Sequence, residues 1–365
     1  MQLKTIIAAL EKFAPTGFAE PWDNVGLLAG DLAQDVSKTM LTVDYTAAVA
    51  QEAKSNRCDL VISYHPPIFH PLKRLTADSL VFDAIRRGVA IYSPHTALDA
   101  TDRGTNDMLA EAIGLTERTA LRPGTPQNSN YKLVAFVPAE HVQQVSAAIF
   151  AAGAGQIGRY SSCSFRSEGT GTFFGHEGTN PTIGRTGQLE TVNEIRLETI
   201  VPSDRAADVI AALRKSHPYE EPAFDLNVLA YPPGQNLSLG TGRIGRMPPA
   251  ARPAIFARIK RELELEHLLI AGPTEGSITT AAVCAGSGGQ MLDDALRGGA
   301  QLYLSGEIRH HDALRAAAAG MTIVCTLHSN SERAVLKRLK KRLEETPGMP
   351  PIQISAVDHD PFAVM

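Results

Sequence analysis

Short apolar runs alternate with helical segments at the start of this chain, and this alternation constrains the fold more than any other feature of the sequence. Residues 39–45, 60–65 and 89–95 form three apolar runs of strand length. Residues 47–55 and 79–88 lie between them and have helical character. An order of strand, helix and strand at this spacing favours a parallel sheet that is covered by helices.

The middle of the chain follows a different pattern. Residues 122–130 and 231–242 are polar and rich in Gly and Pro, which is typical of linkers. Between these linkers we expect strand, helix, two strands, helix and strand, which is the order of a ferredoxin-like domain. The segments that carry this expectation are residues 132–138, 140–153, 160–174, 190–202, 203–217 and 224–229, with Ser203 as the N-cap of the second helix.

From about residue 243 the alternation of the first stretch resumes. We infer a two-part α/β domain that is interrupted by an inserted α+β domain, although separate flanking domains would give the same pattern. This interpretation assigns residues 1–125 to the first half of the α/β domain, residues 126–230 to the ferredoxin-like insert, and residues 231–365 to the second half.

The charge balance and the apolar runs restrict the possible partners. Lys and Arg number 35 against 39 Asp and Glu, a net charge of −4, so bulk binding of nucleic acid is not favoured. No apolar run approaches the roughly 20 residues that a membrane-spanning helix needs. Residues 1–13 are interrupted by Glu11 and Lys12, and therefore predict an amphipathic helix and not a signal peptide.

The four cysteines argue against a thiolate metal site. Cys58, Cys163, Cys284 and Cys325 lie far apart and form no C-x-x-C pair. Several of their neighbours in the sequence are apolar, so we expect buried, reduced thiols in a cytoplasmic protein.

Four apolar runs end in a residue that can bind a metal or transfer a proton: His65, His95, Glu307 and His328. In open α/β sheets ligands bind beyond the carboxyl ends of the strands, so parallel strands can bring these residues to one edge. A single His after a strand is most often a turn residue or a buried polar residue. The recurrence in both halves of the chain is what favours a shared site.

Two carboxylates near these strand ends have competing interpretations. Asp99 can bridge two cations, or it can be a solvated loop residue or a helix N-cap. Glu332 stands four residues after His328, so both can bind one ion from a shared helix face. However, Ser329 and Glu332 also match a capping box, which would make Glu332 structural. The spacing alone leaves both questions open.

Three further motifs have weaker signals. In residues 307–311 the adjacent His310 and His311 would point about 100° apart on a helix, so at most one faces a site. Residues 285–289, AGSGG, predict either an anion site or a tight turn. Asp23 and Asn24 contact a ligand or form an Asx-type turn.

Taken together, these motifs resemble the NIF-three-like family of dinuclear-metal, hexameric proteins, also called GTP cyclohydrolase 1 type 2 homologues. The resemblance covers nearly the whole chain, and the order of the motifs is highly specific. The matching segments are PWDNVGLLAG, ISYHPPIF, HTALDA, CAGSGG, LSGEIRHHDAL and LHSNSERAVL, and in the middle GAGQIGRYSSCSF, GTGTF and HPYEEPAFD. The middle segments resemble those of longer members, whose ferredoxin-like insert is similar to the PII and CutA proteins.

The resemblance implies two divalent cations per subunit, with His65, Asp99, His328 and Glu332 among their ligands. The family often has a second His where this chain has Tyr64. This departure implies that Tyr64 coordinates through its phenolate, that water fills the position, or that the second site is weak. Imidazole and carboxylate ligands suit Zn²⁺, Fe²⁺ or Mn²⁺. The resemblance also implies a toroidal homohexamer whose sites face an internal cavity.

The expected function is a metal-dependent hydrolase of the GTP cyclohydrolase type, acting on GTP or another nucleotide. His95, Glu307 and His310 are the candidates for proton transfer. Two other functions fit the same residues: a metal-binding regulatory scaffold without turnover, and a phosphoester or nucleotide hydrolase with a two-metal clamp.

Overall fold

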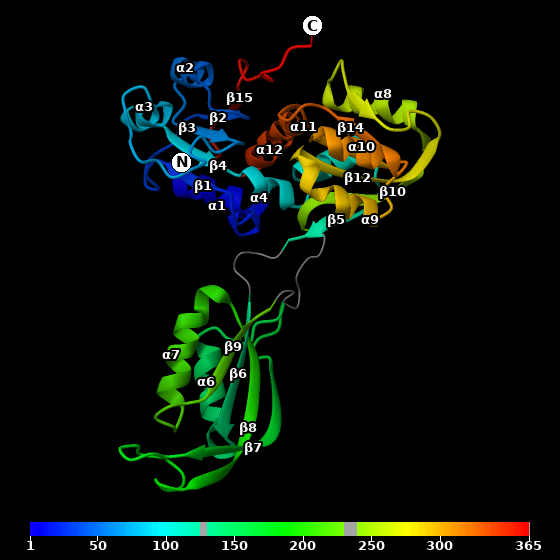
Figure 1. The fold of residues 1–365 in the computed structure, drawn as a ribbon. Helices are drawn as coiled ribbons and strands as arrows, with labels where there is room; N and C mark the ends of the chain where they lie inside the picture. Colours follow the sequence, from blue (N-terminus) through cyan, green and yellow to red (C-terminus); the bar gives the residue numbers. More distant parts are fainter. Residues whose placement is uncertain (125–129, 230–238, 365) are drawn as a thin grey trace. The chain divides into compact units, whose positions relative to one another are not determined.

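The computed structural model describes residues 1–124, 130–229 and 239–364 (Figure 1). The chain forms two compact units: one combines residues from both ends of the chain, and the other is the middle stretch. The cores of the two predicted linkers, and the predicted domain boundaries at 125–126 and 230–231, lie outside the described residues.

The first sheet of the two-ended unit has five strands. In spatial order they are β1 (Gly26–Ala29), β4 (Ala90–Ser93), β3 (Leu60–Ser63), β2 (Thr39–Thr42) and β15 (Ile352–Ile354). Only β1 is antiparallel to its neighbour. Helix α1 (Leu3–Phe13) packs on one face, and α2 (Ala47–Ser55) and α3 (Leu80–Arg86) pack on the other. β2, β3 and β4 are fully buried, which explains their continuous apolar runs.

The second sheet has six strands. In spatial order they are β11 (Leu269–Ala271), β14 (Thr322–Cys325), β13 (Leu302–Glu307), β12 (Ser277–Ser287), β10 (Gly240–Ala251) and β5 (Glu117–Pro123). β12, β13 and β14 are parallel, and the outer pairs are antiparallel. The helices of its inner face are α5 (Thr105–Ile113), α8 (Arg252–Leu263) and α12 (Val335–Glu344), and those of the outer face are α9 (Leu292–Arg297) and α10 (His310–Ala318).

The two ends of the chain exchange strands, and this makes one unit of them. β5 precedes the middle stretch but pairs with β10, which follows it. β15 lies near the C-terminus but pairs with β2 of the first sheet. One buried apolar cluster also contains residues of both sheets, among them Leu41 and Ile62 with Val283 and Leu304. The mixed α/β fold therefore has two sheets around a shared core.

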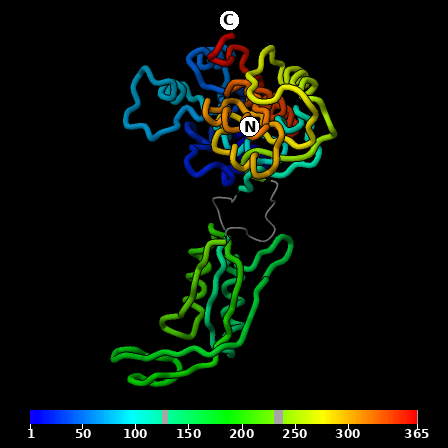
Figure 2. The backbone as a smooth tube through the Cα atoms, turned by 45° about the vertical axis from the view of Figure 1, so that its right-hand side comes forward, coloured from blue at the N-terminus to red at the C-terminus, as the bar shows by residue number. Residues whose placement is uncertain are grey.

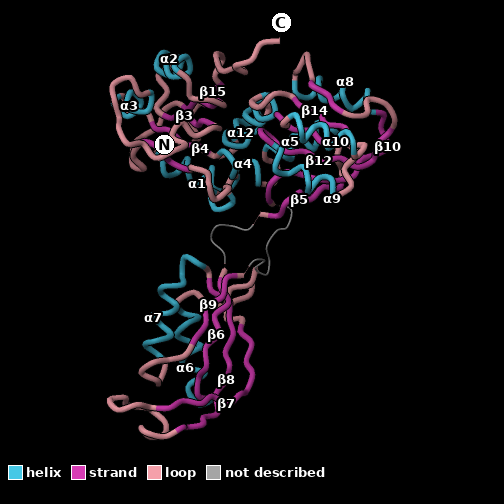
Figure 3. The backbone as a smooth tube through the Cα atoms, viewed as in Figure 1, coloured by secondary structure: helices cyan, strands magenta, loops and turns pink. Residues whose placement is uncertain are grey.

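The middle unit is built on one antiparallel sheet with the order β7–β8–β6–β9. Helices α6 and α7 lie side by side on one face of this sheet, and the other face has no helix among the described residues (Figures 2 and 3). Along the chain the elements are β6 (Tyr131–Pro138), α6 (Val142–Ala151), β7 (Ser164–Phe174), β8 (Leu189–Val201), α7 (Ala206–Ser216) and β9 (Phe224–Val228).

Some local expectations were wrong. Ser203 is not an N-cap, because a 3₁₀ turn over Ser203–Arg205 precedes α7 and the Ser203 hydroxyl has no hydrogen-bond partner. The patterns also do not predict β1, β5, β10, β11 or β15. β10 contains Pro248 and Pro249, which normally argue against a strand, and its register with β12 shifts between Arg246 and Ala250 to accommodate them.

Two further findings concern the whole described chain. No helix among the described residues has both the length and the apolar character that crossing a bilayer requires. All four cysteines are free thiols; Cys163 is partly exposed, and the other three are buried as expected.

Candidate metal centre

The carboxyl ends of the parallel strands in both sheets carry the candidate site. His65 follows β3, and His95 opens α4 (His95–Ala100) directly after β4. Glu307 is the last residue of β13, and His328 follows β14. The placement of these residues after strand ends therefore corresponds to a real feature of the fold, although it uses two sheets instead of one.

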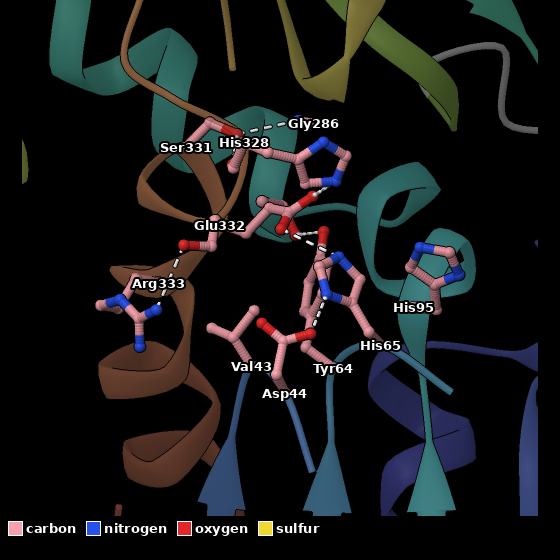
Figure 4. A network of polar contacts seen from close by, with 12 residues as sticks. Val43, Asp44, Tyr64, His65, His95, Gly286, His328, Ser331, Glu332 and Arg333 are labelled. Atoms are coloured by element: carbon pink, nitrogen blue, oxygen red, sulfur yellow. Dashed lines mark hydrogen bonds and ion pairs between the residues drawn. The ribbon is translucent and has the colours of Figure 1, made fainter. Parts of the chain in front are cut away.

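Three side chains converge closely: His65, His328 and Glu332. Each of them has a possible ligand atom, and these atoms all lie within 4.8 Å of one another. Glu332 Oε2 is 3.1 Å from His65 Nε2, and Glu332 Oε1 is 3.4 Å from His328 Nε2 (Figure 4). Two imidazoles and a carboxylate at such distances are a ligand set for a divalent cation.

Each imidazole is oriented by a carboxylate on its far nitrogen. His65 Nδ1 donates to Asp44 Oδ1 at 2.9 Å, and His328 Nδ1 donates to Glu307 Oε1 at 3.1 Å. These bonds fix the tautomers and leave both Nε2 atoms directed at Glu332. Sequence reasoning missed Asp44, although it is the last residue but one of the run 39–45 and follows the strand β2 by two residues.

Two observations show that the site fits a metal ion. His65 Nε2 and Glu332 Oε2 are buried and lie 3.1 Å apart, and each has only the other as a polar partner, without regular hydrogen-bond geometry. Gly286 borders the same space: a Cβ there would lie 2.7 Å from Glu332 Oε1 and 3.2 Å from His328 Nε2. Buried polar atoms that are poorly hydrogen-bonded are costly, and a shared cation would satisfy both.

The structure excludes one of the two interpretations of Glu332, the capping box. Helix α11 (Asn330–Arg333) begins after Ser329, whose side chain caps no backbone N–H and instead donates to Asp360 at 2.8 Å. Glu332 is 2% exposed and faces the two imidazoles. The capping box is not formed.

Asp99 and Tyr64 form a pair beside this group. The buried Tyr64 hydroxyl donates to Asp99 Oδ1 and lies 3.2 Å from Thr105 Oγ1. Burial, and the charges of Asp99 and Glu332, raise the pKa of Tyr64 well above its usual value. Burial, and the charge of Glu332, raise the pKa of Asp99 to about 6. Two carboxylates close enough to oppose each other's ionisation mark a place for positive charge.

The charge on His65 depends on the carboxylates of Asp44 and Glu332. Burial alone would lower its pKa, but the hydrogen bonds to Asp44 and Glu332 raise the pKa of His65 to about 10. In the metal-free protein a proton therefore occupies the imidazole that a cation would use, so metal and proton compete for this residue.

His95 is held by a buried carboxylate that the sequence analysis had interpreted as either a ligand contact or a turn residue. His95 Nδ1 donates to Asp23 Oδ1 at 2.8 Å, and Asp23 also accepts from Asn24 N and from Thr96. The ring centroid of His95 is 5.3 Å from that of His65. His95 has a φ of 26°, which is unusual for a residue other than glycine and is typical of functional positions.

A family model decides the relationship of this chain to known proteins. The model of Duf34/NIF3, NGG1p interacting factor 3, matches residues 1–361. The chain belongs to the Duf34/NIF3 family. The family expected from the sequence motifs is thus confirmed.

Relatives of similar length support the assignment. Proteins of Halalkalibacterium halodurans and Bacillus subtilis are 38% and 36% identical to this chain, each over at least 98% of both chains, and both are named "GTP cyclohydrolase 1 type 2 homolog". A crystal structure of a Bacillus cereus protein related to NIF3 is 34% identical, with a TM-score of 0.68, over 100% of this chain and 99% of the other. A Staphylococcus aureus structure is 26% identical with a TM-score of 0.79 over the same shares.

Two motifs of this Duf34/NIF3 protein, the adjacent histidines and the AGSGG loop, do not supply ligands to the candidate metal centre. His310 and His311 are both exposed, and neither lines the cavity described below. In the AGSGG loop, Gly286 N donates to Ser331 Oγ and Gly288 N to Ser305 Oγ. These two amides are therefore not free to bind an anion, and the loop is a turn that gives Glu332 room.

The metal centre opens into a cavity of about 760 Å³, within the size range of ligand pockets. His65, His95, Asp99, His328 and Glu332 all line it, and Glu307 does not. Its other walls carry residues that the sequence analysis missed, among them Trp22, Phe69, Arg122 and Arg309. Trp22 is 57% exposed, and its ring centroid lies 5.9 Å from that of Phe69.

Proposed function

We propose that this protein binds two divalent cations per subunit and is a metal-dependent hydrolase of the GTP cyclohydrolase 1 type 2 class. The observation that carries the proposal is the convergence of two buried atoms, His65 Nε2 and Glu332 Oε2, which have only each other as a polar partner, with His328 beside a glycine that leaves space for an ion. Zn²⁺, Fe²⁺ or Mn²⁺ suits these ligands.

His65, His328 and Glu332 would hold the first ion. Asp99, with Tyr64 hydrogen-bonded to it, would hold the second together with Glu332. Tyr64 would remain a neutral phenol that orients Asp99, because burial disfavours its phenolate. A bound cation would supply a water of lowered pKa as the nucleophile near neutral pH.

The remaining roles fall to residues of the chain itself. Asp44 and Glu307 position the imidazoles of His65 and His328. Asp23 holds the Nδ1–H of His95, so Nε2 of His95 is the atom available to accept or donate a proton in the cavity. His95 is therefore the preferred general acid or base, ahead of Glu307 and the exposed His310.

A nucleotide, with GTP as the first choice, is the proposed substrate. The relatives carry a name that refers to GTP, and the cavity joins the metal centre to aromatic side chains, Trp22 and Phe69, on which a planar ring can stack. Arg309 adds a guanidinium at the cavity wall that makes no side-chain hydrogen bond or ion pair to another described residue.

The test is incubation of metal-replete protein with GTP. We expect formate to be released, and we expect His95→Ala and Glu332→Gln to abolish its release. His310→Ala is the matched control and should keep the activity, because His310 lies outside the cavity. Release of phosphate would instead assign a phosphoester hydrolase, and binding without turnover would assign a scaffold. Binding can be followed directly through the fluorescence of Trp22, since the chain has one Trp.

We also propose the assembly and location that the family resemblance implies: a cytoplasmic homohexamer of toroidal shape, in which the middle unit is a ferredoxin-like module of the PII and CutA kind. The antiparallel order β7–β8–β6–β9 supports the last point. Light scattering on purified protein should give a mass six times that of the chain.

A further inference from the structure

A second cavity lies within the middle unit and is not used by the proposed function. Its volume is about 300 Å³. Two motifs that the metal centre leaves unexplained form its walls: the end of β7, in GTGTF, and the segment HPYEEPAFD after α7. These segments are far apart in the sequence, so the fold itself creates the cavity.

Aromatic and apolar side chains make up much of the lining. Phe136 comes from β6, Phe173 and Phe174 come from the end of β7, and Ile183 comes from the loop between β7 and β8. Phe174 is 48% exposed, which is high for a large apolar side chain. Aromatic faces that are open to a cavity can bind apolar groups, and also cations through their π-systems.

The charged groups of the lining are all acidic. Glu194, Glu220 and Glu221 line the cavity, and no Lys, Arg or His is present among the described residues that do so. Glu194 lies directly over Gly171: a Cβ there would be 2.3 Å from Glu194 Oε2. No described basic side chain forms an ion pair with Glu194. A partly buried carboxylate against an apolar wall, with no basic side chain beside it, favours a positively charged ligand.

The Tyr219 hydroxyl is a second polar group in the lining of this cavity, next to Glu194. The Tyr219 hydroxyl oxygen is buried and makes no hydrogen bond of regular geometry. The segment that carries Tyr219 is nevertheless well fixed, because the buried His217 bonds the carbonyl of Phe136 through Nε2 at 3.0 Å and accepts from Tyr219 N through Nδ1 at 3.1 Å. The hydroxyl is therefore held beside the Glu194 carboxylate, which, after burial, raises the pKa of Tyr219.

We propose that this cavity binds a small organic cation, an ammonium group attached to an apolar or aromatic body. Glu194 neutralises the charge, the phenylalanines pack against the body and the cation, and the Tyr219 oxygen accepts a hydrogen bond from the ammonium group. An anionic ligand is excluded by the three carboxylates. The site is separate from the metal centre, so the inference goes beyond the proposed hydrolase function and does not depend on it.

The experiment compares two probes of nearly equal shape, phenethylammonium and the neutral 2-phenylethanol, by calorimetric titration of the full-length protein. We expect saturable binding of the ammonium probe and at least tenfold weaker binding of the alcohol. Glu194→Gln should weaken the ammonium probe at least tenfold and leave the alcohol unchanged. Gly171→Ala should do the same, because the new methyl group displaces the Glu194 carboxylate.

Glu198→Gln is the matched control. Glu198 lies on the same strand, pairs with Lys132 and Arg196, and does not line the cavity, so binding should not change. Circular dichroism and the metal content of each variant show whether it is folded. Equal binding of both probes, no saturable binding of the ammonium probe, or a folded Glu194→Gln protein with unchanged affinity would each overturn the proposal.

Discussion

Gly286 shows how one backbone position serves the metal centre. Its φ of +61° favours glycine, and its missing side chain leaves the space between Glu332 and His328. In the sequence it is part of AGSGG, which predicted either an anion site or a tight turn. The run of glycines indicates an unusual backbone conformation. Only the tertiary structure shows that the Glu332 carboxylate and the His328 imidazole occupy the space beside Gly286.

Replacing Gly286 by Ala should remove metal binding for a steric reason. The new methyl group would lie 2.7 Å from Glu332 Oε1, so the ligands must move apart. Gly299→Ala is the control, because its φ is +72° but a Cβ there meets nothing within 4 Å. Both variants should lose roughly 1–2 kcal/mol of stability from backbone strain. Elemental analysis should find metal depleted in Gly286→Ala alone; equal metal content in both would contradict the steric argument.

The raised pKa of Asp99 predicts that its ionised form, which the proposed metal site requires, lowers the stability of the metal-free protein. Its pKa is raised in the folded protein from 3.8 to about 6, so the stabilising protonated form is fully present below pH 3.8 and is lost as the pH rises through 6. At pH 8 the ionised Asp99 therefore destabilises the metal-free protein. The difference corresponds to between roughly 1 and 3 kcal/mol.

The Asp99→Asn variant should consequently be more stable than the natural protein in EDTA at pH 8, with a smaller gain at pH 5. Added Zn²⁺ or Mn²⁺ should stabilise the natural protein more than the variant, since the variant lacks a ligand carboxylate. Urea unfolding with and without metal measures both effects. A variant that is less stable than the natural protein in EDTA at pH 8 would show that the ionised Asp99 does not destabilise the metal-free protein.

At the scale of elements, a buried ion pair joins α5 to β10 behind the site. Arg243 is 1% exposed, and its Nε donates to Asp107 Oδ1 at 2.8 Å. Its guanidinium also donates to the carbonyls of Ala100 and Thr101 at the end of α4, the helix that carries Asp99. Arg243 thus holds the helix that carries Asp99 against the second sheet.

Arg243→Ala should destabilise the protein by about 3–5 kcal/mol, because it leaves Asp107 buried without its main partner. Arg118 bonds the same Asp107 oxygen but is 24% exposed, so Arg118→Ala should cost less. Urea denaturation of both variants at equal metal content gives the comparison. Equal losses would mean that the exposed arginine compensates for the buried one.

At the scale of the whole molecule, the strand exchange predicts that the two-ended unit folds without the middle unit. Pro123 at the end of β5 pairs directly with Gly240 at the start of β10, so the chain ends on either side of the middle unit are neighbours. A short Gly/Ser loop in place of residues 125–238 would convert β5 and β10 into a hairpin. The shortened protein should retain metal binding by elemental analysis. Loss of metal from a folded protein would show that the middle unit supports the site.

The sequence by itself determined the family, the alternation of buried strands and helices, and the placement of His65, His95, Glu307 and His328 after strand ends. These features are local: a run of apolar residues and the residue that follows it can be seen without knowing the neighbours in space. The middle stretch was separated from its flanks for the same reason, since its pattern differs.

Only the tertiary structure decided how these residues combine. It placed Glu332 against two imidazoles instead of in a capping box, and Asp23 and Asp44 behind His95 and His65. It also arranged the strands of the two chain ends in two sheets, and joined these ends into one unit by pairing β5 with β10 and β15 with β2. Such contacts join segments up to hundreds of residues apart. Their free energy depends on burial and on distances between side chains, which a one-dimensional pattern does not contain.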